Sequence, residues 1–153
     1  MVKWKTSKIQ WHDADSEPAS YDDIIGKIKS NNSYEIHVGC DSHQYADYTR
    51  IVSVICLRKG PNGVITYRKM HNETPSSTIY LKLQREVLEA LQLAQLVSDV
   101  GFEEVTVHLD INPNDKYLSN KFYKEFVNMV RGCGYKCITK PDAFAASIAD
   151  MFT

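Results

Sequence analysis

Two apolar segments that each end on an aspartate constrain the fold of this chain more than any other feature. Residues 34–41 alternate apolar and polar side chains and finish at Asp41, and residues 103–111 do the same with Asp110 near the end. A period of two is typical of a β-strand with one buried face. Because a helical segment separates the two strands, we expect them to be parallel neighbours whose carboxyl ends meet at one edge of a sheet.

The remaining periodic segments predict an α/β domain. We expect strands over residues 34–41, 50–58, 64–70, 103–111 and 135–139, helices over residues 77–99, 119–131 and 142–151, and a short leading helix that Ser20 caps. Short links make the first three strands antiparallel, and helical links make the first, fourth and fifth parallel. The predicted fold is a five-stranded mixed sheet with strand order 3-2-1-4-5 and helices on both faces. Residues 1–33 form an arm and short helix packed on the domain of residues 34–153.

Glu86 interrupts the apolar stripe of the helix over residues 77–99. A carboxylate on a core-facing stripe is costly unless it is paired or bound to a metal ion. The alternative is that Glu86 lies at the edge of the stripe and pairs with Lys82, four residues earlier. The apolar members of the stripe are Ile79, Leu83, Ala90, Leu93 and Val97.

Two carboxylates side by side at a strand edge predict a cation site. Asp41 and Asp110 would repel each other, and one would be protonated unless a cation lies between them. Mg²⁺ prefers oxygen ligands and commonly holds substrate phosphates as well. Two such ions can activate water and stabilise the leaving oxygen of a phosphodiester. The sequence therefore predicts a site for a divalent cation, Mg²⁺ or Mn²⁺, of the kind that can support phosphodiester cleavage.

Length and composition exclude several other classes of protein. The chain has 153 residues, a formal net charge of −1 and four cysteines. This length suits a single domain, and the net charge predicts no global attraction to nucleic acid or membrane. No apolar run is long enough for a transmembrane helix, and the N-terminus has no apolar signal region. We therefore expect a cytoplasmic protein with reduced cysteines and no membrane partner.

Four motifs, in order, resemble a known family. They are His37-Val-Gly-Cys-Asp-Ser, His108-Leu-Asp-Ile-Asn, Ser119-Asn120-Lys121 and Lys140-Pro-Asp-Ala-Phe-Ala-Ala-Ser. Together with the order of elements, they resemble the ribonuclease H-like superfamily and, within it, the YkuK-like family, over residues 34–153. The resemblance implies a ribonuclease H-like fold with catalytic, metal-binding acids at Asp41, Glu86, Asp110 and Asp142.

The final helix offers two candidates for the fourth acid. Asp142 and Asp150 are eight residues apart, so on a helix they differ by about 80° in direction and about 12 Å in height. Both cannot serve one metal ion. We choose Asp142, because it follows the fifth strand directly and matches the last acid of the superfamily. Asp150 is the alternative.

Five further polar residues are candidates for substrate binding. Ser42 and His43 directly follow the first acid, and His43 either positions a phosphate or is an ordinary exposed histidine. Asn112 either hydrogen-bonds substrate or shapes the turn before Pro113. Asn120 and Lys140 belong to the third and fourth motifs, and Lys140 is either a phosphate contact or an exposed lysine.

Three functions remain open at this point. The first is a metal-dependent nuclease that cleaves phosphodiester bonds in RNA or an RNA–DNA hybrid. The second is a catalytically silent nucleic-acid-binding domain on the same fold, and the third is a protein-interaction module, with a homodimer as one form. The complete set of acids favours the first, and the near-neutral charge favours the third, because phosphate binding normally requires clustered cations.

Overall fold

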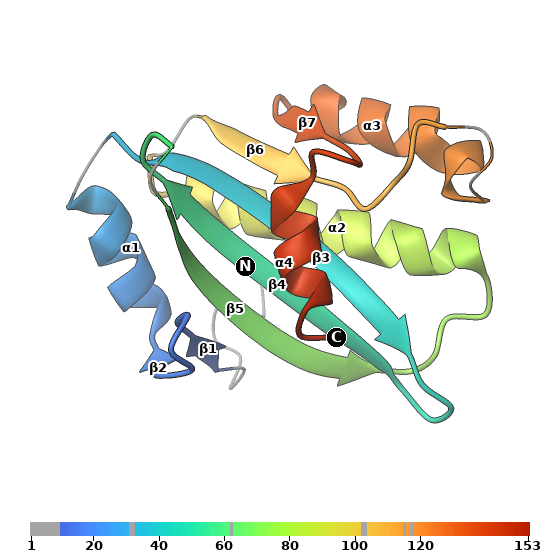
Figure 1. The fold of residues 1–153 in the computed structure, drawn as a ribbon, viewed down its shortest axis with the longest axis horizontal. Coiled ribbons are helices and arrows are strands. Elements are labelled where there is room, and N and C mark those ends of the chain that lie inside the picture. Colours follow the sequence, from blue (N-terminus) through green and yellow to red (C-terminus); the bar gives the residue numbers. More distant parts are fainter. Residues whose placement is uncertain (1–9, 31–32, 62, 102–103, 115, 117) are drawn as a thin grey trace.

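The computed structural model describes residues 10–30, 33–61, 63–101, 104–114, 116 and 118–153. A single mixed sheet runs through this part of the chain, with strand order β2-β1-β5-β4-β3-β6-β7 (Figure 1). Its strands are β1 (Trp11–His12), β2 (Pro18–Ala19), β3 (Glu35–Gln44), β4 (Thr49–Arg58), β5 (Val64–Glu73), β6 (Val105–His108) and β7 (Lys136–Ile138).

The strand directions confirm the predicted fold class. β3, β4 and β5 are antiparallel to one another, and β3, β6 and β7 are parallel. The prediction of five strands was wrong, because β1 pairs with the outer edge of β5 and β2 pairs with β1. Strands of two residues have no periodicity to recognise. The first nine residues of the predicted arm lie outside the described residues.

The helices lie on both faces of the sheet, as expected (Figure 1). They are α1 (Tyr21–Lys29), α2 (Ile79–Ser98), the 3₁₀ helix η2 (Leu118–Phe122), α3 (Tyr123–Gly132) and α4 (Phe144–Asp150). Ser20 caps α1 in a capping box with Asp23, which confirms that prediction. None of the helices in the described ranges is long and apolar enough to cross a membrane.

Two apolar layers sandwich the sheet. The larger core joins α1, α2 and α3 to one face and contains fully buried side chains such as Ile24, Leu93 and Phe126. On the opposite face, Ala145 and Ala149 of α4 pack against apolar side chains of β4. Because alanine side chains are small, α4 lies close to the sheet.

Gly39 permits the closest approach of α4 to the sheet. A Cβ atom on Gly39 would lie 2.7 Å from the backbone nitrogen of Ala146 and 2.8 Å from the carbonyl carbon of Ala145. These contacts are with backbone atoms, which cannot rotate away. Gly39 therefore sets the distance between α4 and β3.

Replacing Gly39 with alanine should push α4 off the sheet. We expect Gly39→Ala to lower the free energy of unfolding by about 1–3 kcal/mol, as overpacking does, measured by urea denaturation. Gly26→Ala is the control, because a Cβ there meets nothing within 4 Å and alanine stabilises a helix interior by about 0.5–1 kcal/mol. A Gly39→Ala protein as stable as wild type would contradict this packing.

Candidate active site

Asp41 lies where β3 loses its parallel neighbour. β6 pairs with β3 only as far as Gly39 and His108, whereas β3 continues beyond Asp41 to Gln44 along β4. The strand over residues 103–111 is thus shorter than predicted at its C-terminal end. This gap in the strand pairing lies at Asp41, which is nevertheless only 3% exposed.

Glu86 reaches this gap from α2. It is 4% exposed, and its Oε2 accepts hydrogen bonds from Ser42 Oγ and from Lys82 Nζ, the latter at 2.8 Å. Both alternatives for Glu86 therefore hold in part. Glu86 interrupts the buried stripe of α2, and it also pairs with Lys82. The pair is not a surface pair, because the Glu86 side chain is buried.

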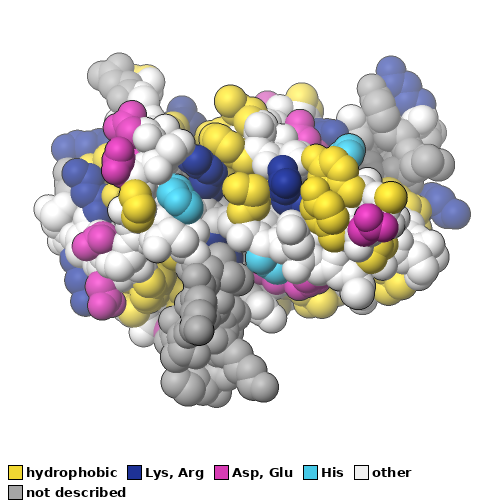
Figure 2. Space-filling view, turned by 90° about the horizontal axis from the view of Figure 1, so that it is seen from below, with side chains coloured by type: hydrophobic (Ala, Val, Ile, Leu, Met, Phe, Trp, Pro, Cys, Tyr) yellow, Lys and Arg dark blue, Asp and Glu magenta, His cyan; other side chains and the backbone are white. Residues whose placement is uncertain are grey.

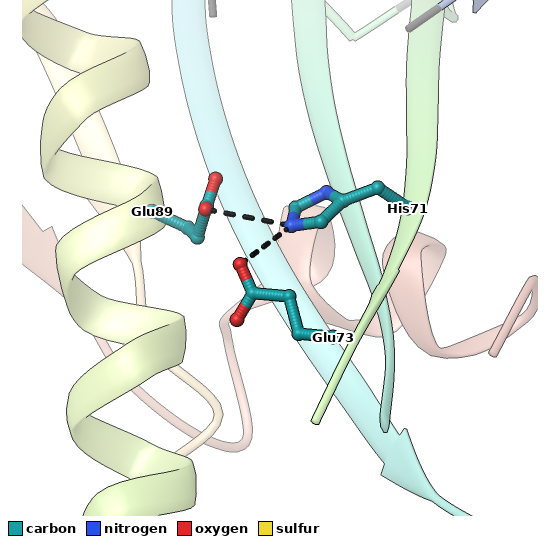
Figure 3. Close-up of side chains that lie close together, drawn as sticks. All are labelled: His71, Glu73 and Glu89. Atoms are coloured by element: carbon teal, nitrogen blue, oxygen red, sulfur yellow. Dashed lines mark hydrogen bonds and ion pairs between the residues drawn. The ribbon is translucent and has the colours of Figure 1, made fainter. Parts of the chain in front are cut away.

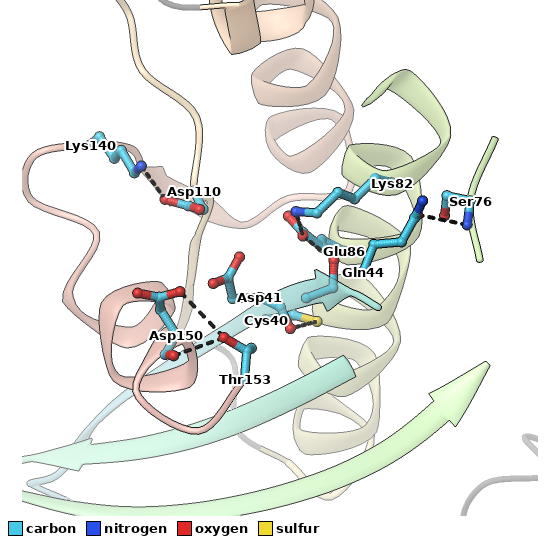
Figure 4. Close-up of polar contacts among 11 residues, drawn as sticks. Cys40, Asp41, Gln44, Ser76, Lys82, Glu86, Asp110, Lys140, Asp150 and Thr153 are labelled. Carbon is cyan, nitrogen blue, oxygen red and sulfur yellow. Dashed lines mark hydrogen bonds and ion pairs between the residues drawn. The ribbon is translucent and has the colours of Figure 1, made fainter. Parts of the chain in front are cut away.

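Asp110 lies in the segment after β6 and is held by Lys140. The Lys140 Nζ and Asp110 Oδ1 atoms are 2.8 Å apart. Backbone hydrogen bonds align the two segments, from Leu109 N to Ile138 O and from Lys140 N to Ile111 O. Lys140 is thus a partner of the carboxylate in this structure (Figure 4).

Asp150, at the end of α4, completes a set of four acids around Asp41. Phe144 at the start of α4 contacts the rings of His37 and His108, and the next turn covers Gly39. The helix therefore runs along β3 towards Asp41. Its last residue, Asp150, lies beside Asp41 (Figure 4) and raises the pKa of that carboxyl.

Asp142 is exposed and precedes α4 rather than beginning it. The prediction of a helix over residues 142–151 was wrong at its start, because Asp142 N bonds to Thr139 O in a turn and α4 begins at Phe144. Asp150 is among the acids that raise the pKa values of Asp41 and Lys140, and Figure 4 shows it beside Asp41. The geometry thus brings Asp150, the alternative, to the other three acids.

Burial and the three neighbouring acids raise the pKa of Asp41 to about 9, from an ordinary value of 3.8. Burial is the largest cause, followed by the carboxylate of Glu86 and then by Asp150. Burial also raises the pKa of Glu86, although Lys82 opposes the shift. Without a further cation, Asp41 therefore holds a proton at neutral pH.

The donors of this set fit a hard divalent cation. All four are carboxylates, the ligands that Mg²⁺ and Mn²⁺ prefer, and Asp41 is a buried acid whose charged form requires a cation nearby. Among the described residues, no three of these four acids place an oxygen each within 4.8 Å of one another. A single Mg²⁺ ion would therefore take one or two of these carboxylates directly and complete its coordination with water.

His37 and His108 form a buried network of hydrogen bonds and do not contact the four acids. Ala145 N donates to His108 Nδ1 at 3.4 Å, so His108 carries its proton on Nε2 and donates to His37 Nδ1 at 2.8 Å. His37 then donates from Nε2 to Glu35 at 3.1 Å. Burial lowers the pKa of His108 to about 3, so it stays neutral. These hydrogen bonds connect α4 to β3 and β6.

The other residues predicted to bind substrate differ in burial and in their hydrogen-bond partners. Ser42 is buried and donates to Glu86, and His43 is exposed with its ring 4.6 Å from that of Tyr45. Asn112 accepts a hydrogen bond from Asn114 N, and Asn120 donates to Pro113 O. The two asparagines thus shape one loop, which agrees with the turn alternative for Asn112.

An aromatic and basic hairpin beyond Asp41 was missed in the sequence. The rings of Tyr45 and Tyr48 stack with centroids 4.9 Å apart, and the Arg50 guanidinium lies 5.5 Å and 6.0 Å from them. Tyr45 also bonds through its hydroxyl to the carbonyl of Thr153, beside the end of α4. Two tyrosines three residues apart in a polar link between two strands are the sequence signal that could have indicated this hairpin.

Comparison with known proteins identifies the class of this fold. The family model described as Ribonuclease H-like matches residues 20–153. The chain belongs to the ribonuclease H-like family, which confirms the resemblance of its motifs.

Two individual proteins are similar to the chain. The uncharacterized protein YkuK of Bacillus subtilis (strain 168) is 24% identical over 158 residues, which cover 88% of this chain and 91% of YkuK. This similarity confirms the YkuK-like character of the motifs. Ribonuclease H1 from the halophilic archaeon Halobacterium salinarum NRC-1 has a crystal structure with a TM-score of 0.43 and 12% identity, covering 78% of this chain and 99% of the other.

The raised pKa of Asp41 predicts a pH dependence of stability. Below 3.8 Asp41 is protonated in both states, and between 3.8 and about 9 only the folded state holds the proton. Folding therefore takes up a proton, and the free energy of unfolding should fall as pH rises from about 7 to about 9. This range lies above the titration of His108, whose lowered pKa gives the opposite slope below about 6.5.

Urea denaturation with excess EDTA measures this slope. Asp41→Asn removes the proton uptake, so its stability should depend less on pH and exceed that of wild type at the alkaline end. Asp142→Asn is the matched control and should keep the wild-type slope, because Asp142 is exposed. Equal slopes for wild type and Asp41→Asn would show that Asp41 is not a buried, protonated acid.

Proposed function

We propose that this protein is a metal-dependent nuclease that hydrolyses phosphodiester bonds in RNA or an RNA–DNA hybrid. The observation that supports this function best is the convergence of three carboxylates on the buried Asp41. Bringing like charges together is costly, so such an arrangement indicates a site for cations. Membership of the ribonuclease H-like family agrees with nuclease chemistry.

The acids would hold Mg²⁺ or Mn²⁺, with Asp150 in place of Asp142 as the fourth. When bound, such ions activate a water molecule and stabilise the leaving oxygen of the cleaved bond. Asp41 provides the central carboxylate and gives up its proton. Ser42 orients Glu86 through its hydrogen bond.

Lys82 and Lys140 have a separate role in the proposed site. They balance the charge of Glu86 and Asp110, at 2.8 Å each. Although burial works against its charge, Lys82 has a raised pKa because of Glu86 and Asp41, and the hydrogen bond with Asp110 raises the pKa of Lys140. Both remain ammonium groups at neutral pH. The Lys140 side chain is 46% exposed. If Asp110 bound a metal ion instead of Lys140, the ammonium group would be accessible to a substrate phosphate.

The hairpin of Tyr45, Tyr48 and Arg50 would contact the nucleic acid beside the acids. Bases stack on aromatic rings with little dependence on sequence, and arginine adds charge. On the face that Figure 2 shows, basic side chains lie in several separate places, among acidic and apolar side chains. Binding through this hairpin would therefore depend on the ions and on stacking.

A catalytically silent nucleic-acid-binding or protein-interaction domain is the second candidate. Lys82 and Lys140 already compensate two of the four acids without any metal ion. An acid set that is neutralised by lysines can persist as a structural network after activity is lost. The homodimer and the cytoplasmic location stay predictions.

Substitution of the acids tests the proposed function directly. With labelled RNA, RNA–DNA hybrid and DNA substrates in Mg²⁺ or Mn²⁺, Asp41→Asn and Asp110→Asn should each abolish cleavage, because each removes a charged ligand without changing side-chain size. Asp150→Asn should reduce the single-turnover rate by orders of magnitude. Asp142→Asn is the matched control from the same segment and should cost much less.

Two outcomes would contradict the proposal. If Asp41→Asn cleaved substrate at the wild-type rate, the acids would have no part in the reaction. Binding of nucleic acid without cleavage of any substrate, with either ion, would establish the silent domain instead. A loss in Asp142→Asn that exceeds the loss in Asp150→Asn would return the fourth acid to Asp142.

A further inference from the structure

A second set of ligating side chains lies away from the four acids, between β5 and α2. His71 and Glu73 are two residues apart on β5, so both face α2, and Glu89 projects towards them from that helix (Figure 3). Within the described part of the chain, these are the only three His, Cys, Asp or Glu side chains with ligand atoms all within 4.8 Å of one another.

The distances in this cluster are close to those between ligands of one ion. His71 Nε2 lies 3.0 Å from Glu73 Oε1 and 3.7 Å from Glu89 Oε1, and the three ligand atoms all lie within 4.8 Å of one another. Donors about 2.0–2.2 Å from a metal ion at tetrahedral or octahedral angles are about 3.0–3.5 Å apart. Glu73 and His71 already have this separation, and Glu89 would have to move towards them to share the ion.

The polar contacts of His71 converge on this point. Its Nε2 faces both carboxylates, whereas its buried Nδ1 has no hydrogen-bond partner among the described residues. Because Nε2 is the ring nitrogen with polar contacts, the imidazole is oriented with Nε2 towards the two glutamates. When Nε2 binds a metal ion, Nδ1 carries the ring proton. Because no second-shell acceptor supports that proton, we expect binding weaker than at a fully buttressed site.

Two basic side chains neighbour the glutamates: Arg85 contacts Glu73, and the buried Lys69 interacts electrostatically with Glu89. Arg85 Nε binds Glu73 Oε2 at 3.1 Å, which fixes that carboxylate with Oε1 towards His71. The side chains of His71 and Glu89 are 17% and 18% exposed, and that of Glu73 is 36% exposed. An ion can thus enter from solvent, and three protein ligands leave positions for water.

We propose that His71, Glu73 and Glu89 bind one divalent transition-metal ion, with Zn²⁺ preferred over Mg²⁺. An imidazole nitrogen with two carboxylates suits zinc, whereas Mg²⁺ prefers oxygen ligands only. The ion joins β5 to α2 and has open positions for water or another small ligand. This site is distinct from the four acids around Asp41 and does not depend on the proposed nuclease activity.

Calorimetric titration with Zn²⁺ tests the site in the Asp41→Asn, Cys133→Ser background. The first change weakens the acid set, and the second removes the exposed thiol that would compete for zinc. The background protein should bind one Zn²⁺ per chain. His71→Gln and Glu89→Gln should each weaken this binding at least tenfold, whereas His43→Gln, at the exposed histidine beside Tyr45, should bind as the background does.

A second measurement keeps the test valid if the substitutions impair folding. X-ray absorption of the background protein with one equivalent of Zn²⁺ should show nitrogen and oxygen ligands that include one imidazole, and no sulfur. Absence of Zn²⁺ binding, a sulfur ligand, or unchanged affinity in folded His71→Gln would each overturn the proposal. These results leave the nuclease proposal untouched, because cleavage is assayed separately.

Discussion

The site depends on one unfavourable interaction, the burial of Asp41 among other carboxylates. The cost is visible in its pKa, which rises to about 9 because burial and its acidic neighbours oppose ionisation. The surrounding fold maintains this arrangement. β6 stops short of Asp41 and opens the gap, while the backbone pairing of the segments around Asp110 and Lys140 fixes a second acid beside it. A cation would relieve the repulsion that the fold imposes.

The position of α4 decides which acid arrives from the C-terminal segment. Close contact at Gly39 and the hydrogen bond from the helix to His108 hold α4 along β3. The C-terminal end of α4, which carries Asp150, therefore lies beside Asp41 (Figure 4). The same face leads to the tyrosine hairpin, since Tyr45 bonds to the last residue of the chain. The tyrosine hairpin thus lies close to the end of α4, where Asp150 is found.

The sequence predicted the parts of this structure that depend on periodicity. Alternation and the helical link placed Asp41 and Asp110 at one edge, and the interrupted stripe placed Glu86 in a buried position. The choice between Asp142 and Asp150 stays a prediction. It was hard to make from the sequence, because a turn at Thr139 shifts the start of the helix and no local pattern shows the direction of the helix along the sheet. Contacts across the sheet, such as that of Glu89 with His71 (Figure 3), likewise depend on tertiary packing.

Proton release on binding of Mg²⁺ or Mn²⁺ tests the central claim most directly. Titration calorimetry near pH 7.5, in buffers with different ionisation enthalpies, gives the number of protons released per ion bound. Because Asp41 must lose its proton to bind a cation, the account predicts release of about one proton in wild type and close to none in Asp41→Asn. Metal binding without proton release, or equal release in both proteins, would contradict a cation site built on a buried, protonated Asp41.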